Sequence, residues 1–111
     1  MSNKEAKLQI RLKYGSYCFM TGYKLNKDAT YHHIVKKQHG GLPNAENGAI
    51  LSSAIHNHLH SVIEHENKQQ FALINECLNL YKKCMDKNEE NLIEQYEGEI
   101  MPFFRQMIKK K

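Results

Sequence analysis

Apolar side chains in the C-terminal part of the chain recur at the spacing of an α-helix, and this periodicity constrains the fold more than any other feature. Steps of three and four residues place side chains along one face of a helix. Two sets of residues follow such steps: Phe71, Ile74, Leu78, Tyr81 and Met85, and then Ile93, Tyr96, Ile100, Phe103 and Met107. We therefore predict two amphipathic helices after about residue 66. Their apolar stripes form the core or, as the alternative, the contact surface of a dimer.

Polar residues and a proline mark the limits of the second of these helices. Asp86 and Glu89 have the spacing of a capping box, in which two side chains accept from each other's backbone N–H groups at a helix start. Pro102 has no backbone N–H and cannot complete the helical hydrogen-bond ladder. We expect the second helix to begin after Asp86 and to break or kink over residues 98–101.

Residues 4–13 carry two conflicting patterns. Leu8, Ile10 and Leu12 alternate as in a strand, whereas the lysine, glutamate, alanine and glutamine residues around them favour a helix. Gly15 follows directly, and glycine is common just after a helix end. We predict a helix.

The stretch that follows contains short β-forming runs separated by turn residues. Gly40-Gly41 and Pro43-Asn44 indicate a loop, and Ser52 or Ser53 is suited to cap a helix start. We predict, in order, a strand at 29–35, a loop at 36–46, a strand at 48–51 and a helix to about 66. Together with the other helices this order predicts an α+β fold.

The chain of 111 residues has the length of a single domain, 1–111. The sequence contains no run near the roughly 20 apolar residues that a membrane span needs, and its start lacks the apolar stretch of a secretory signal. Cys18, Cys77 and Cys84 are an odd number of cysteines, which fits reduced thiols better than a disulfide framework. We expect a cytoplasmic protein without a membrane partner.

Histidines carry the functional prediction, because six of the seven in the chain fall between positions 32 and 60. His56 and His60 are four residues apart on the predicted helix, so they share a face with Cβ atoms roughly 5 to 6 Å apart. A third ligand from His32 or His33 would complete a site for a transition metal ion and leave an open coordination position. Spacing alone does not decide which of the two adjacent histidines binds. The spare one is suited to act as a base near pH 7.

Positive charge is concentrated in the first part of the chain. Residues 1–44 contain eight basic and two acidic residues, a charge of +6, while the whole chain carries +4. This asymmetry favours a polyanionic partner, and a solvated surface is the alternative. The cations expected to contact phosphate are Lys36, Lys37, Arg11 and Lys13.

The spacing of His33, Asn47 and His56, at steps of 14 and 9 residues, resembles the His-Asn-His pattern of HNH endonucleases, the ββα-metal (His-Me finger) nucleases. His32, which directly precedes the first histidine, and the His56-x-x-x-His60 spacing are also similar to that family. The resemblance covers about residues 14–65. It leaves an N-terminal helix and a C-terminal helical hairpin, about 66–111, unmatched.

The resemblance implies a role for each residue of the pattern. His33 corresponds to the general base that activates the attacking water, and Asn47 to the residue whose amide holds the loop between the strands. His32, His56 and His60 correspond to ligands of one divalent metal ion, whether Mg²⁺, Mn²⁺, Ni²⁺, Co²⁺ or Zn²⁺. That ion contacts the scissile phosphate and stabilises charge on the leaving 3′ oxygen.

The chain departs from many members of the family, which carry two Cys-x-x-Cys pairs around a structural zinc ion. Cys18 is the one cysteine at these four positions, and Thr21, Ser52 and Ile55 stand at the other three. A four-cysteine zinc site is therefore excluded. We expect apolar packing with the C-terminal helices to stabilise the fold instead.

Two functions are consistent with these residues. The first is a metal-dependent endonuclease acting on DNA, expected to be double-stranded. The second is a non-catalytic module that retains the fold and binds nucleic acid, or assembles with a second copy or another protein through the C-terminal helices. A purely structural metal site is disfavoured because structural zinc usually draws on cysteine ligands.

Overall fold

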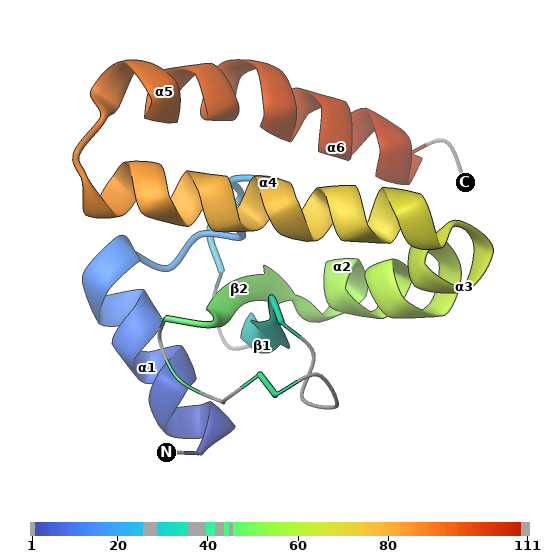
Figure 1. The fold of residues 1–111 in the computed structure, drawn as a ribbon, viewed down its shortest axis with the longest axis horizontal. Helices are drawn as coiled ribbons and strands as arrows, with labels where there is room; N and C mark the ends of the chain where they lie inside the picture. The colour runs from blue at the N-terminus through green and yellow to red at the C-terminus, as the bar shows by residue number, and fades with distance from the viewer. Residues whose placement is uncertain (1, 26–28, 36–39, 42–43, 45, 110–111) are drawn as a thin grey trace.

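The computed structural model describes residues 2–25, 29–35, 40–41, 44 and 46–109, which form helices around a small two-stranded antiparallel sheet (Figure 1). The fold is α+β, as predicted. In chain order the elements are α1 (Asn3–Tyr14), β1 (Ala29–His33), β2 (Gly48–Ser52), α2 (Ser53–His58), the π-helical segment η2 (Leu59–Ile63), α3 (Glu64–Glu66), α4 (Lys68–Asp86), α5 (Glu90–Gln95), the π-helical segment η3 (Tyr96–Ile100) and α6 (Met101–Lys109). Figure 1 shows α4 lying between the α5–α6 arm and a layer that holds α1, the sheet and α2–α3.

Residues 3–14 are helical, so the helix-forming neighbours prevail over the strand-like alternation. The Ser2 side chain accepts from the Glu5 backbone N–H at the start of α1, and Gly15 follows its end with φ +90°. Ala6 and Ile10 are buried, whereas Leu8 is exposed. The helix therefore directs one narrow apolar face toward the core and leaves the other alternating leucines outside it.

The two strands pair antiparallel, with Ala29 opposite Ser52 and His33 opposite Gly48. β1 ends at His33, two residues earlier than predicted, because the side chain of Asn47 takes both backbone hydrogen bonds of Val35. Ser52 then ends β2 and caps α2 by accepting from a backbone N–H. The change from strand to helix thus occurs at the serine pair, as predicted.

The first apolar stripe is confirmed. Phe71, Ile74, Leu78 and Tyr81 are buried on α4, and Met85 packs against the same core. This face of α4 packs against β1 and the π-helical segment η2. The helix that bears it is therefore the element that holds the histidine-bearing part and the C-terminal arm together.

Lys82 is the unexpected member of the buried face of α4, at 3% exposure. Its Nζ donates to the backbone carbonyl of Gly48 at 2.7 Å. The N–H of Ile34 donates to the carbonyl of Asn47, so the next pair, His33 with Gly48, is a non-hydrogen-bonded pair of the ladder. The carbonyl of such a pair points away from the partner strand, and Lys82 supplies the partner it needs.

The second stripe is correct at Tyr96 and wrong at Phe103. The helix continues past Pro102 without a break, and the irregularity near residues 98–101 is the π-helical turn η3, which replaces four-residue hydrogen bonding with a wider five-residue step. That step brings Met101 and Phe104 to the buried face that Tyr96 begins, while Phe103 is 60% exposed.

The predicted capping box is also wrong. Glu89 is the N-cap of α5, but among the described residues no side-chain hydrogen bond caps this start. The Asp86 carboxylate instead accepts from the Tyr14 hydroxyl and forms an ion pair with Lys13 at 3.1 Å. Long-range contacts with α1 therefore outweigh the local capping pattern.

The cysteines and the lengths of the helices bear on two further predictions. Cys18, Cys77 and Cys84 are all free thiols. Among the described residues, no helix combines the length and the apolar character that a membrane crossing requires.

Candidate metal centre

Three histidines from different elements meet at one end of the sheet. His32 comes from β1, His56 from α2 and His60 from η2, and one ring nitrogen of each lies within 4.8 Å of the others. Their ring centroids are 5.4 Å apart for His32 and His56, 5.3 Å for His32 and His60, and 4.7 Å for His56 and His60. The three imidazoles are close enough to bind one metal ion.

The local sequence explains how the helix contributes two of these rings. Four residues make slightly more than one helical turn, which places His56 and His60 on one face. The wide turn η2 begins between them at Leu59, whose side chain is fully buried. The buried leucine anchors the helix while the two histidines on another side of it face β1.

The two ring nitrogens of His32 lie in different environments. Its Nε2 lies 2.7 Å from Oδ1 of Asn75 on α4. Its Nδ1 is buried and has no hydrogen-bond partner within the described part of the chain. His32 as a whole is only 1% exposed, so it is held in place on one side and presents an unsatisfied nitrogen on the other.

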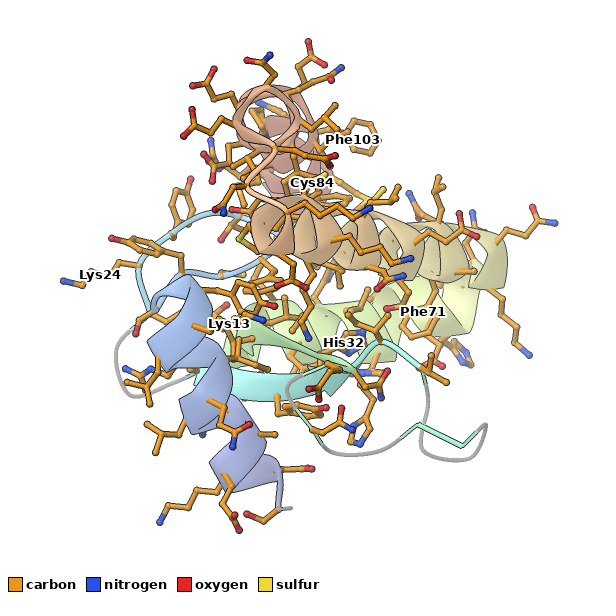
Figure 2. The ribbon with its side chains drawn as sticks, turned by 60° about the vertical axis from the view of Figure 1, so that its left-hand side comes forward. Lys13, Lys24, His32, Phe71, Cys84 and Phe103 are labelled. Atoms are coloured by element: carbon orange, nitrogen blue, oxygen red, sulfur yellow. The ribbon has the colours of Figure 1, made fainter. Side chains whose placement is uncertain are left out.

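His60 is held in a similar way by an acidic side chain. Its Nδ1 lies 2.8 Å from Oε1 of Glu64, one turn later on the same helix, and its side chain is 40% exposed. The ring of Phe71 packs against both His60 and His32, with centroids 5.5 and 6.2 Å away. Figure 2 shows His32 and Phe71 next to each other beneath α4.

Sequence reasoning missed Asn75 and Glu64 as residues of this centre. Asn75 lies one helical turn after Phe71, which packs on the cluster, and Glu64 lies one turn after His60, a member of the cluster. That spacing was visible in the sequence. It points to the centre only once α4 is known to pack beside β1.

Burial keeps two rings of the cluster, His32 and His56, electrically neutral at pH 7. Removal from water lowers the pKa of His32 to about 4, an effect that the hydrogen bond to Asn75 opposes and the nearby rings of His56, His60 and His33 reinforce. Burial likewise lowers the pKa of His56 to about 4, with His60 and His33 adding to the decrease. Metal ions bind the neutral imidazole, so these two rings are in the ligand form at neutral pH.

His33 lies on the opposite face of β1 from the cluster, because adjacent strand residues point to opposite sides. Its ring packs edge-on against Tyr31, with centroids 4.8 Å apart. It is nevertheless near enough for its charge to lower the pKa of both His32 and His56. The structure therefore separates His33 from the three clustered rings while keeping it in their electrostatic neighbourhood.

Asn47 lies where the loop returns to the sheet. Its Oδ1 accepts from the Val35 backbone N–H at 2.8 Å, and its Nδ2 donates to the Val35 carbonyl at 3.0 Å. Its own backbone N–H donates to Oδ1 of Asn44. The amide therefore pairs with the backbone two residues beyond His33, which is the kind of contact the resemblance implies for this position.

Lys13 and Arg11, the two predicted phosphate-binding cations that the structure describes, have partners outside the cluster. Lys13 pairs with Asp86, which lies eleven residues after Asn75 on α4, roughly 16 Å along the helix axis. Arg11 donates from Nε to the Ser16 hydroxyl at 3.0 Å. Lys36 and Lys37 lie outside the described residues. The DNA contacts expected of all four residues stay predictions.

The positions that carry zinc cysteines in many HNH proteins come together in this structure. Cys18, Thr21, Ser52 and Ile55 all line one cavity of about 270 Å³. The cavity also borders Ile108 of α6, so the C-terminal arm closes one side of it. These four side chains therefore lie around one cavity, although together they do not form a metal-binding set.

Comparison with known proteins adds no assignment. No family model matches the chain, and neither the curated proteins nor the solved structures contain a significant match.

Proposed function

We propose that this protein is a metal-dependent, HNH-type endonuclease that hydrolyses phosphodiester bonds of double-stranded DNA. The observation that carries the proposal is the convergence of His32, His56 and His60 on one end of a strand–strand–helix unit. In the ββα-metal fold that the sequence resembles, about residues 14–65, this is the place of the single divalent ion. The grouping of Cys18, Thr21, Ser52 and Ile55 around one cavity adds support, because the sequence resemblance aligns these positions with that family's zinc-binding cysteines.

The donor set fits a divalent transition ion. Burial keeps His32 and His56 neutral, and the buried Nδ1 of His32 has no hydrogen-bond partner among the described residues. Co²⁺, Ni²⁺ and Zn²⁺ suit imidazole nitrogens better than Mg²⁺ does. When bound, the ion would supply positive charge to the scissile phosphate and to the leaving 3′ oxygen.

His33 acts as the general base in this proposal. It ends β1 on the face opposite the cluster, and a phosphate lying across the strand end could approach both sides. The neutral imidazole accepts a proton from water as the water oxygen attacks phosphorus and the bond to the 3′ oxygen breaks. Asn47 holds the backbone just beyond His33 and so keeps this ring oriented.

The test is the conversion of supercoiled plasmid to nicked circles by purified protein. We expect nicking with at least one of Mg²⁺, Mn²⁺, Co²⁺ and Ni²⁺, and complete loss of nicking when EDTA is added. Plasmid that stays intact with every ion would contradict the nuclease and favour the non-catalytic binding module.

Variants separate the two roles. His33→Ala should lower the nicking rate by about 10²- to 10⁴-fold, the usual contribution of a general base, while metal affinity measured by calorimetry stays the same. His56→Ala should weaken metal binding itself. His58→Ala is the matched control, because His58 belongs to the same helix and lies outside the three-histidine cluster. Equal loss of metal affinity in His33→Ala and His56→Ala would refute this division of roles.

A further inference from the structure

Asn75 belongs to the C-terminal helical extension, the part of the chain that the nuclease-like pattern does not reach, yet it touches the metal centre. Its Oδ1 lies 2.7 Å from Nε2 of His32, although the two residues are 43 positions apart. Phe71, one turn earlier on α4, packs on the ring of the same histidine. Two side chains of one helix face therefore hold the buried ring that β1 contributes.

The chemistry of this contact decides where the single proton of neutral His32 resides. An amide oxygen can only accept a hydrogen bond, so the Nε2 atom facing it must carry the hydrogen. The other nitrogen, Nδ1, then carries a lone pair. This is the nitrogen that is buried without a hydrogen-bond partner among the described residues.

Because His32 is buried, water cannot supply the hydrogen bond that its Nδ1 lacks among the described residues. An acceptor that is buried without a partner destabilises the folded protein, and His32 is only 1% exposed. A ring flip would put Cε1 in place of Nε2 and so remove the bond to Asn75. A cation that accepts the Nδ1 lone pair would instead satisfy both sides of the ring.

His60 shows the same arrangement with a different partner. Oε1 of Glu64 lies 2.8 Å from Nδ1 of His60. Metal-binding histidines commonly donate their second nitrogen to a carboxylate or a carbonyl, and such partners fix the orientation of the ring. Glu64 belongs to the same helix as His60, whereas Asn75 reaches His32 from α4.

We propose that Asn75 is a positioning residue of the metal centre, which keeps the hydrogen of His32 on Nε2 and thereby presents Nδ1 to the ion. This inference rests on the proposed metal site but not on nuclease activity. It makes the docking of α4 part of metal binding, so the helical extension contributes a hydrogen bond to the centre as well as apolar packing.

The first test is the tautomer of His32 in the metal-free protein. Long-range ¹H–¹⁵N correlation spectra at pH 7.5 should show a hydrogen on Nε2 and an unprotonated Nδ1 in the wild type. In Asn75→Leu, which keeps the size of the side chain but removes the acceptor, we expect a mixture of tautomers. A wild-type His32 that carries its hydrogen on Nδ1 would overturn the proposal.

The second test is the affinity for Ni²⁺ and Zn²⁺ by calorimetry, without DNA. Asn75→Leu should bind these ions about 10- to 100-fold more weakly, the usual effect of removing such a partner. Asn75→Asp, which retains an acceptor oxygen in the same place, should bind within a few fold of the wild type. Asn79→Leu is the matched control, because Asn79 lies one turn further along α4 and borders a different cavity.

The outcomes separate this inference from the proposed function. Wild-type protein that binds neither ion would refute the metal site itself. Wild-type binding with unchanged affinity in Asn75→Leu would refute only the role of Asn75. Far-UV circular dichroism and the melting temperature of each metal-free variant show whether the fold is retained, and the tautomer measured in the wild type decides the question if Asn75→Leu does not fold.

Discussion

Replacing Lys82 by methionine should remove a pH dependence of stability between pH 7 and pH 9.5. Lys82 is 3% exposed and donates to the Gly48 carbonyl. Burial lowers its pKa from 10.5 to about 8, although the charges of Asp86 and Glu46 act in the opposite direction. The ammonium form is therefore disfavoured in the folded protein.

The sign and size of the effect follow from this pKa. Between pH 8 and pH 10.5 the unfolded chain keeps the proton of Lys82 and the folded protein has lost it, so folding stability rises with pH in this window. Below pH 8 the side chain is protonated in both states, and the penalty is fully present. A pKa of 10.5 in the unfolded state and about 8 in the folded state corresponds to a gain of about 2 kcal/mol from pH 7 to pH 9.5.

Urea unfolding of the wild type and Lys82→Met at both pH values measures the effect. Tyrosine and cysteine titrations occur in both proteins and cancel in the comparison. We expect the free energy of unfolding of the wild type, relative to the variant, to rise by about 2 kcal/mol with pH, or roughly 8 °C in melting temperature for a domain of this size. Lys83→Met, at an exposed position next to it, is the control and should follow the wild type.

A pH response that is the same in the wild type and Lys82→Met would refute this explanation. It would mean that water reaches the ammonium group of Lys82 and that the Gly48 carbonyl does not hold it in a dry site. The absolute stability of the variant at pH 7 is a separate quantity, because methionine removes a buried charge but also leaves that carbonyl without its donor.

Other contacts give three shorter predictions. Tyr96→Phe removes the hydroxyl that donates to a buried backbone carbonyl at 2.9 Å and should cost about 1 to 3 kcal/mol in urea unfolding; the same cost in exposed Tyr17→Phe would contradict this. Asn47→Ala should speed amide hydrogen exchange at Val35, whose N–H donates to the Asn47 side chain. Unchanged exchange would argue against a stabilising role for this hydrogen bond. Gly22→Ala should lower stability by about 1 to 3 kcal/mol, because its φ is +78° and a Cβ would lie 2.8 Å from a methionine sulfur; a wild-type melting temperature would exclude that strain.

Periodicity in the sequence is sufficient to predict most of the helices and the pairing of two histidines. The stripe of Phe71 and Leu78 and the shared face of His56 and His60 depend only on the rise and twist of a helix, which neighbouring residues determine. The serine cap of α2 is equally local. These features are predictable from the amino-acid sequence because no distant contact is needed to explain them.

Local rules failed where a distant contact or an irregular turn intervened. The capping pattern of Asp86 was wrong because α1 brings Tyr14 and Lys13 to its carboxylate. The stripe failed at Phe103 because a single π-helical turn shifts every later residue around the helix. Such a turn depends on how the whole helix packs, so the spacing of apolar residues does not reveal it.

In the candidate metal centre, too, residue spacing predicts one part and tertiary contacts decide the other. Spacing left open which of His32 and His33 joins the helical pair, and the tertiary structure brings His32 to it, because the pleat of β1 turns adjacent side chains to opposite faces. Asn75 is 43 residues from His32 and meets it only because α4 packs across the sheet. Local structure depends on residues close in the sequence, whereas the partner of a buried polar atom depends on how whole helices and strands pack together.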